Sequence, residues 1–347
     1  MTKKHSGNNK TRRQLFSVYF FAMYVNLSEW KAARDLQQRP SYLVVVETIA
    51  LGLIFVTSTT GNILSCVIMY RSPRLRTWHN LLLLNVIFVD LLATILCVPS
   101  AFVVLLTGKW SGGESLCSAV AYMSCLLLIV SIITLATISI SRYYLITDLL
   151  KYMTIFKKKN IAWMLLAIWV YAILCAFPPL VGWGEFIFLP GNAMCFMYFG
   201  SSLSYAAVFT LLVIGLPVAI IIACFVRVRQ ISKASKRIKS LSPVTSIASE
   251  EIDSAKTLFS VVVIVLLCWF PVCLLFLLAT LGVELPRQVS LISTYSVFLP
   301  CALKPLIYFY MKKQFWAGLV DLLNKLVPFR RRGKRVSPMS RTKNNLK

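Results

Sequence analysis

Two ionisable side chains, Asp90 and Lys304, lie deep inside long apolar stretches of this sequence. A charged side chain at the centre of a membrane span costs on the order of 2.5–3.5 kcal/mol on insertion scales, so such residues indicate a functional site by default. Glu47 is also surrounded by apolar residues. It lies near the end of its stretch, where its side chain can reach the interface, so no special role is expected for it.

The composition indicates a protein that faces lipid. Of 347 residues, 58% are hydrophobic and only 14% are charged, which is too few charges for the surface of a soluble protein of this length. The formal net charge of +25 does not indicate a nucleic-acid partner, because the basic residues fall in short connections and tails. The sequence has no Cys-x-x-Cys motif or Cys/His cluster, so neither a metal nor a cofactor is expected.

Seven apolar runs of roughly 20 residues are long enough to cross a bilayer as helices. The short alternating segments of a membrane barrel do not appear in the sequence. The predicted fold class is therefore an all-α membrane protein with a seven-transmembrane helix bundle. The predicted spans are Leu43–Tyr70, Leu81–Leu106, Leu116–Ile140, Ile161–Trp183, Leu203–Val226, Thr257–Leu281 and Val289–Met311.

The basic residues of the connections predict the orientation of the bundle. The second, fourth and sixth connections hold only Lys109 and Arg287 between them, whereas the odd connections and the C-terminal tail are strongly basic. The N-terminus is expected outside and the C-terminus in the cytoplasm, in a multi-pass protein of the plasma membrane. Basic residues near the N-terminus oppose this orientation, whereas glycosylation sequons at Asn9 and Asn26 support it.

Asp90 and Lys304 are expected at similar depths in the membrane. Asp90 lies nine residues from the cytoplasmic start of its span, and Lys304 lies seven residues from the cytoplasmic end of its own. These separations correspond to about 14 Å and about 10 Å along a helix. An ion pair between the two would spare each group an uncompensated burial. The alternative is that each residue separately lines a water-filled cavity.

Four regions are predicted along the chain. Residues 1–42 form an extracellular N-terminal segment, and residues 43–311 hold the seven spans. Residues 312–327 have an apolar stripe opposite lysines, which is typical of a short amphipathic helix on the inner leaflet; the alternative is a disordered tail. Residues 328–347 form a basic cytoplasmic tail. Membrane lipids are therefore expected partners.

Several motifs occur in a fixed order along the spans. They are Gly61-Asn62, Asp90, Cys117, Ser141-Arg142-Tyr143, Trp169, Pro179, Pro217, Cys268-Trp269-Phe270-Pro271 and Lys304-Pro305-x-x-Tyr308. Across residues 44–327 this pattern resembles the rhodopsin-like (class A) G-protein-coupled receptors, in an orphan or opsin-related branch. The resemblance implies a receptor rather than an enzyme, with a heterotrimeric G protein as partner. It also implies that residues 312–327 form the helix 8 of the family.

The resemblance assigns roles to individual residues. Cys117 and Cys195 would form the disulfide between the third span and the second extracellular connection. Trp269 matches the switch at the floor of the ligand pocket, above the kink that Pro271 makes by removing a helix hydrogen bond. The activation switches that the resemblance implies are Arg142, Tyr143, Glu251, Trp269, Pro271, Pro305 and Tyr308.

The sequence departs from the family pattern next to the conserved arginine of the third span. Ser141 stands where an acid usually precedes this arginine, so Arg142 lacks its adjacent partner. Glu251 remains at the position that commonly pairs with it. The departure predicts appreciable basal signalling, and the alternative is a receptor with little G-protein coupling.

The second departure concerns the sodium site of the family. Lys304 stands where the family has an asparagine, which forms that site together with residues matching Asp90 and Ser131. The ammonium group of Lys304 would replace the ion. Insensitivity to sodium is therefore predicted.

The resemblance also places a ligand pocket. Ser124 stands where amine receptors have an aspartate, so a biogenic amine is not expected. Phe298 stands where opsins have the retinal lysine, and Lys304 lies six residues further along. A neutral or lipid-like ligand, or none, fits this apolar pocket. The pocket residues are Ser124, Cys125, Leu128, Phe209, Val213, Trp269, Val272, Cys273, Phe276, Thr294 and Phe298.

Other function classes fit less well. A small membrane transporter could also hold an aspartate and a lysine, but the unequal spans show no repeated halves. A membrane enzyme would need a set of nucleophile, base and acid, and the sequence shows none. The alternatives that remain are a retinal-independent opsin relative with little G-protein coupling and a small membrane transporter. Ser and Thr residues in the fifth connection and the tail are candidate phosphorylation sites, through which arrestin would bind.

Overall fold

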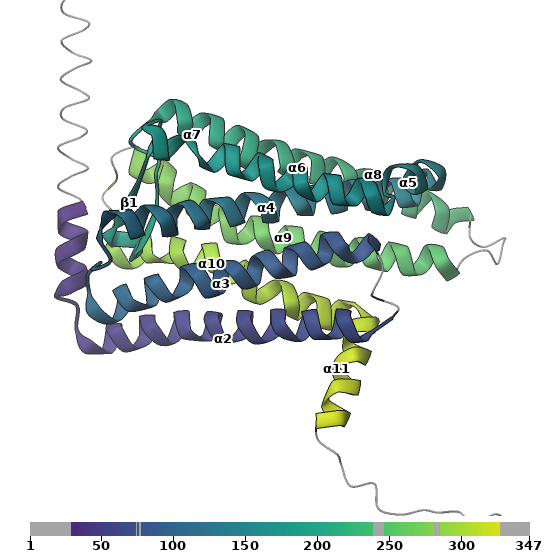
Figure 1. Ribbon diagram of the computed structural model, residues 1–347, viewed down its shortest axis with the longest axis horizontal. Coiled ribbons are helices and arrows are strands. Elements are labelled where there is room, and N and C mark those ends of the chain that lie inside the picture. The colour runs from purple at the N-terminus through teal and green to yellow at the C-terminus, as the bar shows by residue number, and fades with distance from the viewer. Residues whose placement is uncertain are drawn as a thin grey trace, which may run out of the picture.

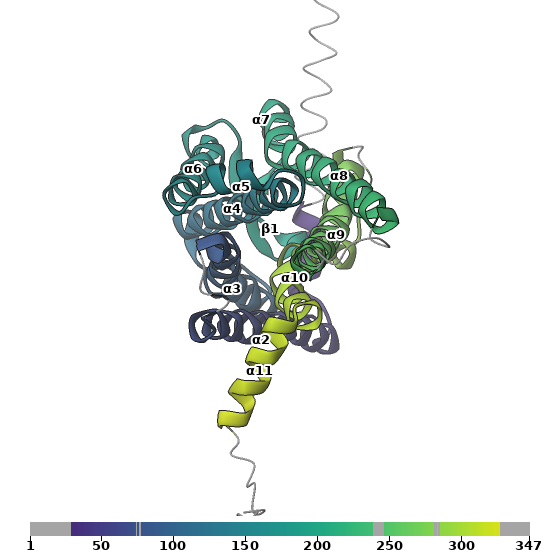
Figure 2. The same cartoon turned by 90° about the vertical axis from the view of Figure 1, so that its right-hand side faces the viewer.

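The computed structural model describes residues 29–326, apart from residues 74, 76, 77, 239–245, 281, 282 and 284. The sequons at Asn9 and Asn26 and the tail of residues 328–347 lie outside the described residues. The long helices lie side by side in a single bundle, as the two views in Figure 1 and Figure 2 show.

The bundle confirms the seven predicted spans. Six helices of the described chain are long and apolar enough to cross a membrane, and Phe259–Leu275 is the apolar part of the seventh. The seven are α2 (Ser41–Arg71), α3 (Leu81–Thr107), α4 (Gly113–Thr147), α6 (Lys158–Ala176), α7 (Leu203–Phe209) continuing into α8 (Leu216–Ile238), α9 (Ser246–Thr280) and α10 (Arg287–Met311).

A π-helical turn, Thr210–Gly215, joins α7 to α8. Pro217 follows it and has no backbone N–H, so it cannot donate to the carbonyl one turn earlier. A π turn is a common way to absorb such a break without ending the helix. The fifth span is therefore one irregular helix rather than the regular one that its hydropathy suggests.

Several short elements are absent from the prediction. A helix over residues 29–37, labelled α1 here, precedes α2, and α5 (Leu149–Ile155) is capped by the Asp148 carboxylate, which accepts a hydrogen bond from the Lys151 backbone N–H. Single 3₁₀ turns occur at Trp78–Asn80 and Pro178–Val181. These elements lie in the connections, which hydropathy does not describe.

A β-hairpin lies between α6 and α7, in a connection for which the sequence predicted no regular element. Strand β1 (Glu185–Leu189) pairs antiparallel with β2 (Met194–Tyr198), and the 3₁₀ turn η3 (Pro190–Asn192) joins them. Each strand has only five residues, too few for periodicity to separate it from a loop. The hairpin lies at the end of the bundle opposite α11 (Figure 1).

The predicted amphipathic helix forms as α11 (Lys313–Leu326), which leaves the bundle at an angle after α10 (Figure 1). Phe315 is fully buried at its start, whereas Trp316 and Leu323 are more than half exposed. A Cβ atom at Gly318 would lie 2.5 Å from Cγ2 of Ile68, so this helix packs closely on the end of α2. One side of α11 thus faces the bundle, and large apolar side chains remain exposed on it.

Helices α2 and α10 also approach closely at Gly61. A Cβ atom at this position would lie 2.8 Å from Cβ of Pro305. Neither the proline ring nor the helix backbone can move away easily, so the absence of a side chain at Gly61 sets the spacing of the two helices. The close approach brings the polar residues of α2 next to those of α10.

We expect Gly61→Ala to lower the free energy of unfolding by about 1–3 kcal/mol, the usual cost of overpacking. Thermal unfolding of the purified protein in detergent, followed with a thiol-reactive dye, measures this change. Gly52→Ala in the same helix is the matched control. Its Cβ atom would meet Phe102 at 3.7 Å, an ordinary contact. Equal melting temperatures for the two variants would contradict the prediction.

Candidate functional site

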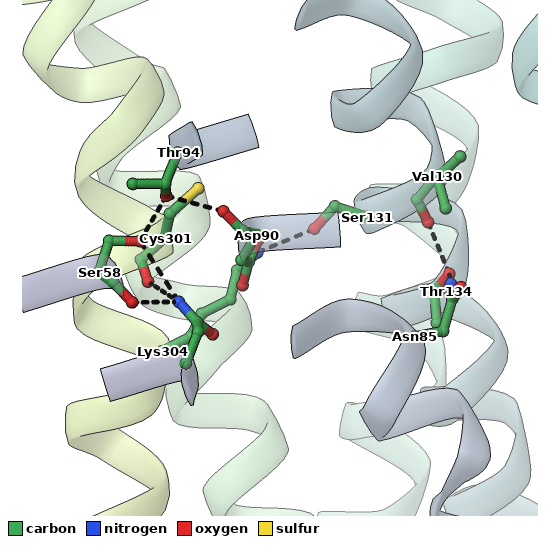
Figure 3. A network of polar contacts seen from close by, with 10 residues as sticks. Ser58, Asn85, Asp90, Thr94, Val130, Ser131, Thr134, Cys301 and Lys304 are labelled. Carbon is green, nitrogen blue, oxygen red and sulfur yellow. Dashed lines mark hydrogen bonds and ion pairs between the residues drawn. The ribbon is translucent and has the colours of Figure 1, made fainter. Parts of the chain in front are cut away.

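The structure brings Asp90 of α3 and Lys304 of α10 together near the middle of the bundle. Lys304 Nζ lies 2.7 Å from Oδ1 of Asp90 and donates a second hydrogen bond of 2.8 Å to Oγ of Ser131 on α4. Asp90 and Lys304 are 2% and 3% exposed. One ammonium group therefore connects three helices at a site where both charged side chains are almost fully buried (Figure 3).

A second set of hydrogen bonds ties α2 to the same region. Oγ of Ser58 and Oγ1 of Thr94 on α3 lie 2.6 Å apart, and Nδ2 of Asn62 donates to the backbone carbonyl of Cys301 at 3.0 Å. Ser58, Thr94 and Cys301 lie beside the ion pair in Figure 3. The short spacing at Gly61 makes these contacts possible, so the polar centre joins four helices.

A cavity of about 50 Å³ lies against the ion pair. Asp90, Ser131 and Lys304 line one part of it, and Trp269 and Phe298 line another. A cavity of this size has room for water, and Asp90, Ser131 and Lys304 supply polar partners on one side of its otherwise apolar lining. The cavity joins the predicted remnant of a sodium site, Asp90 and Ser131, to the floor of the predicted ligand pocket.

The predicted pocket residues fall mostly inside the bundle. Cys125, Phe209, Val213, Thr294 and Phe298 are each at most 3% exposed. Ser124 and Trp269 are slightly more accessible, and Leu128 and Val272 are partly buried. Ser124, Leu128, Trp269 and Phe298 line the cavity beside the ion pair. Cys125, Phe209 and Val213 belong with Phe298 to one apolar cluster.

Two pocket residues need separate comment. Cys273 is exposed, and its assignment to the pocket stays a prediction. It lies one turn after Trp269 on α9, about 40° around the helix from it. The side chain of Phe276 lies outside the described residues, and its assignment stays a prediction.

Strand β2 covers the pocket. Met194, Cys195, Phe196 and Met197 are all at most 6% exposed and pack in the same apolar cluster as Phe298. The predicted disulfide between Cys117 and Cys195 is confirmed, with a Cα–Cα distance of 5.3 Å, and it fixes β2 to the start of α4. Thr294 donates a hydrogen bond to the Asn192 carbonyl, so the pocket side of α10 also holds the loop.

The predicted switch residues lie toward the other end of the bundle. Arg142 lines a small cavity of about 30 Å³ together with Phe225 of α8 and Phe259 of α9. Tyr308 is fully buried, and the rings of Tyr143 and Tyr144 are 5.3 Å apart.

The two prolines among the predicted switch residues lie within long helices. Pro271 and Pro305 lie inside α9 and α10. The side chain of Glu251 lies outside the described residues, so its contact with Arg142 stays a prediction.

One cluster of charges was missed in the sequence. Glu47 does not reach the interface as expected: it is 6% exposed and forms ion pairs with Arg287 and Arg39. The position of Glu47, an acid inside an apolar span, was the one feature of the sequence that could have indicated this cluster. Its partner Arg287 lies 240 positions away, and nothing in the sequence connects them.

Known proteins share both this sequence pattern and this architecture. The profile of the 7 transmembrane receptor (rhodopsin family) matches residues 61–308, more than half of the chain. The chain belongs to this family. The structure of squid rhodopsin superimposes on the receptor with a TM-score of 0.75 at 21% identity, covering 85% of this chain and 89% of that chain, which shows a shared fold.

Sequence relatives of the receptor are distant. The RYamide receptor of Drosophila melanogaster is 26% identical over 335 residues, 91% of this chain and 72% of that protein. Melanopsin of Phodopus sungorus is 28% identical over 285 residues, 78% of this chain and 60% of that protein. The probable G-protein coupled receptor 101 of Homo sapiens is 29% identical over 181 residues, 52% of this chain, and the match spans only 36% of that protein.

We expect Asp90→Asn and Lys304→Met each to lower the free energy of unfolding by about 3–5 kcal/mol, because each leaves one buried charge without its partner. The double variant should lose much less than the sum of the two. Thermal unfolding of the four receptors in a double-mutant cycle measures the coupling. Strictly additive losses would show that the two charges do not stabilise each other.

We also expect exchange of sodium for choline at constant ionic strength to leave the unfolding temperature of the receptor unchanged. The Lys304 ammonium already occupies the space beside Asp90 and Ser131. Lys304→Asn should create a receptor that sodium stabilises, because a cation then binds only to the folded state. A sodium response of the unaltered receptor as large as that of Lys304→Asn would refute the idea.

Proposed function

We propose that this receptor transmits an extracellular or lipid-borne signal across the plasma membrane to heterotrimeric G proteins. The observation that carries the proposal is the position of Arg142. It lines a cavity between α4, α8 and α9, at the end of the bundle that bears the basic connections. An arginine between these helices is placed to respond when they separate and a transducer enters.

The disulfide supports an orientation with the N-terminus outside. Disulfides form in oxidising compartments, so the hairpin held by Cys117 and Cys195 belongs on the extracellular side. Helix α11 leaves the opposite end, next to the strongly basic tail. Two independent signals, the disulfide and the distribution of Lys and Arg, therefore agree.

The covered pocket supports a lipid-like ligand or no diffusible agonist. Apolar side chains of β2 and the bundle enclose it, and Ser124 offers no charge to an amine. Covalent retinal is not proposed, because Phe298 stands at the position of the retinal lysine. Lys304 is held by Asp90 and Ser131.

Basal signalling is part of the proposal. Ser141 is buried next to Arg142 and carries no charge, so it cannot hold the guanidinium as an acid would. Phosphorylation of the Ser and Thr residues in the fifth connection, on the cytoplasmic side, and in the tail would recruit arrestin. The exposed Trp316 and Leu323 of α11 would anchor that helix in the inner leaflet.

A G-protein activation panel on the unliganded receptor in cells tests the proposal. We expect activation of at least one G-protein class above mock-transfected cells at confirmed surface expression. Ser141→Asp should reduce this activity about two- to fivefold, because an adjacent ion pair worth about 0.5–1 kcal/mol would favour the resting state. Thr147→Asp, at an exposed position of the same helix about 140° around it from Arg142, is the matched control and should not reproduce the reduction. Activity no higher than mock across all classes would favour a receptor with little G-protein coupling.

A further inference from the structure

Three charged side chains are buried together at the hairpin end of the bundle. Glu47 lies near the start of α2, Arg287 begins α10, and Arg39 lies in the link between α1 and α2. Their side chains are 7%, 0% and 3% exposed. Arg287 Nη2 donates to Oε1 of Glu47, and Nε of Arg39 lies 3.3 Å from Oε2. We call these three residues the outer cluster.

The outer cluster has more positive charge than its surroundings compensate. Two guanidinium groups face one carboxylate, which leaves a net charge of +1. Arg39 donates to the backbone carbonyls of Leu36 and Leu105. Nε and Nη1 of Arg287 are buried and have no hydrogen-bond partner in the described part of the chain. Buried donors without acceptors and a buried excess charge are both unfavourable, and an anion would relieve both.

The outer cluster lies directly above the predicted ligand pocket. Arg287, Leu291, Thr294 and Phe298 are all at most 3% exposed and follow one face of α10. From Arg287 to Phe298, eleven residues further along, the helix axis extends roughly 16 Å. An anionic group at Arg287 and an apolar chain reaching Phe298 would therefore follow the same face of one helix.

The outer cluster is closed in this structure. Leu36 of α1 is 1% exposed, and a Cβ atom at Gly191 of η3 would lie 3.1 Å from Cβ of Ser290 and 3.8 Å from Cβ of Ala32. Helix α1 and the hairpin turn thus cover the first turns of α10. An occupant would enter by displacing α1.

We propose that Arg39, Glu47 and Arg287 accept the anionic head group, a carboxylate or phosphate, of an amphiphilic ligand whose apolar chain extends along α10 toward Phe298. The proposal rests on the receptor function proposed above and narrows its lipid-like ligand to one with a negative head. Arginine suits this role because its guanidinium keeps its charge when buried and donates charge-assisted hydrogen bonds.

Binding to the purified full-length receptor in neutral lipid nanodiscs tests the proposal without any transducer. Radiolabelled dodecanoate is the probe, dodecanol is the uncharged match, and acetate and inorganic phosphate supply an anion without a chain. We expect saturable dodecanoate binding, at least about tenfold tighter than dodecanol, because one charge-assisted hydrogen bond contributes about 1.5–3 kcal/mol. Neither small anion should compete at concentrations that saturate the dodecanoate site.

Two substitutions should move the affinity in opposite directions. Arg287→Gln should weaken dodecanoate binding at least about tenfold, because it removes the free donors. Glu47→Gln should strengthen binding, because it removes the carboxylate that competes for Arg287 and Arg39. A cluster that only fastens α1 to the bundle would lose stability in both variants without opposite changes in affinity. Arg34→Gln is the control, since Arg34 is exposed on α1 and stacks on Trp30.

Several results would overturn the proposal. These are equal affinities for dodecanoate and dodecanol, competition by acetate or phosphate as strong as by unlabelled dodecanoate, and unchanged affinity in Arg287→Gln. If Arg287→Gln does not fold, the other two residues of the outer cluster still test the proposal. Arg39→Gln should weaken dodecanoate binding, and Glu47→Gln should strengthen it. The binding assay contains no G protein. A negative binding result would therefore reject the anionic ligand but not the receptor function, which the activation panel tests separately.

Discussion

A buried charge needs a partner, and this requirement organises the centre of the receptor. Lys304 meets Asp90 and Ser131, so α3, α4 and α10 must stay in register at that depth. Asn62 adds α2 through the backbone of Cys301. A covalently attached ammonium cannot diffuse away as a bound ion can. The centre of the bundle therefore carries its own cation in every conformation that keeps α10 in place.

The same requirement recurs at the hairpin end, with the opposite balance of charge. There a single carboxylate, Glu47, lies between two arginines. Arg287 and Lys304 both belong to α10, about 25 Å apart along its axis. The predicted ligand pocket occupies the apolar stretch between them. Helix α10 is thus held at its first residue and again beyond its midpoint by buried ionic contacts.

The spans and the ion pair were predictable because each can be recognised within a single stretch of sequence: an apolar run, or a charged residue inside such a run. Apolar runs of about 20 residues predict helices wherever they occur, and the structure agrees to within a few residues at most ends. A charged residue deep in such a run is costly enough to require explanation, and Asp90 and Lys304 were the two deepest. The prediction failed where the outcome depended on packing. Glu47 proved buried, and the strands β1 and β2 were too short to be recognised.

The sequence by itself determined how many helices cross the membrane, which connections are basic and which charges must be neutralised within the bundle. These properties depend on the transfer of single segments from water to lipid, so each can be judged alone. Only the tertiary structure decided that Glu47 pairs with Arg287, that β2 covers the pocket and that Gly61 brings α2 against Pro305. Those outcomes depend on contacts between residues far apart in the chain, which appear only when the helices have packed together.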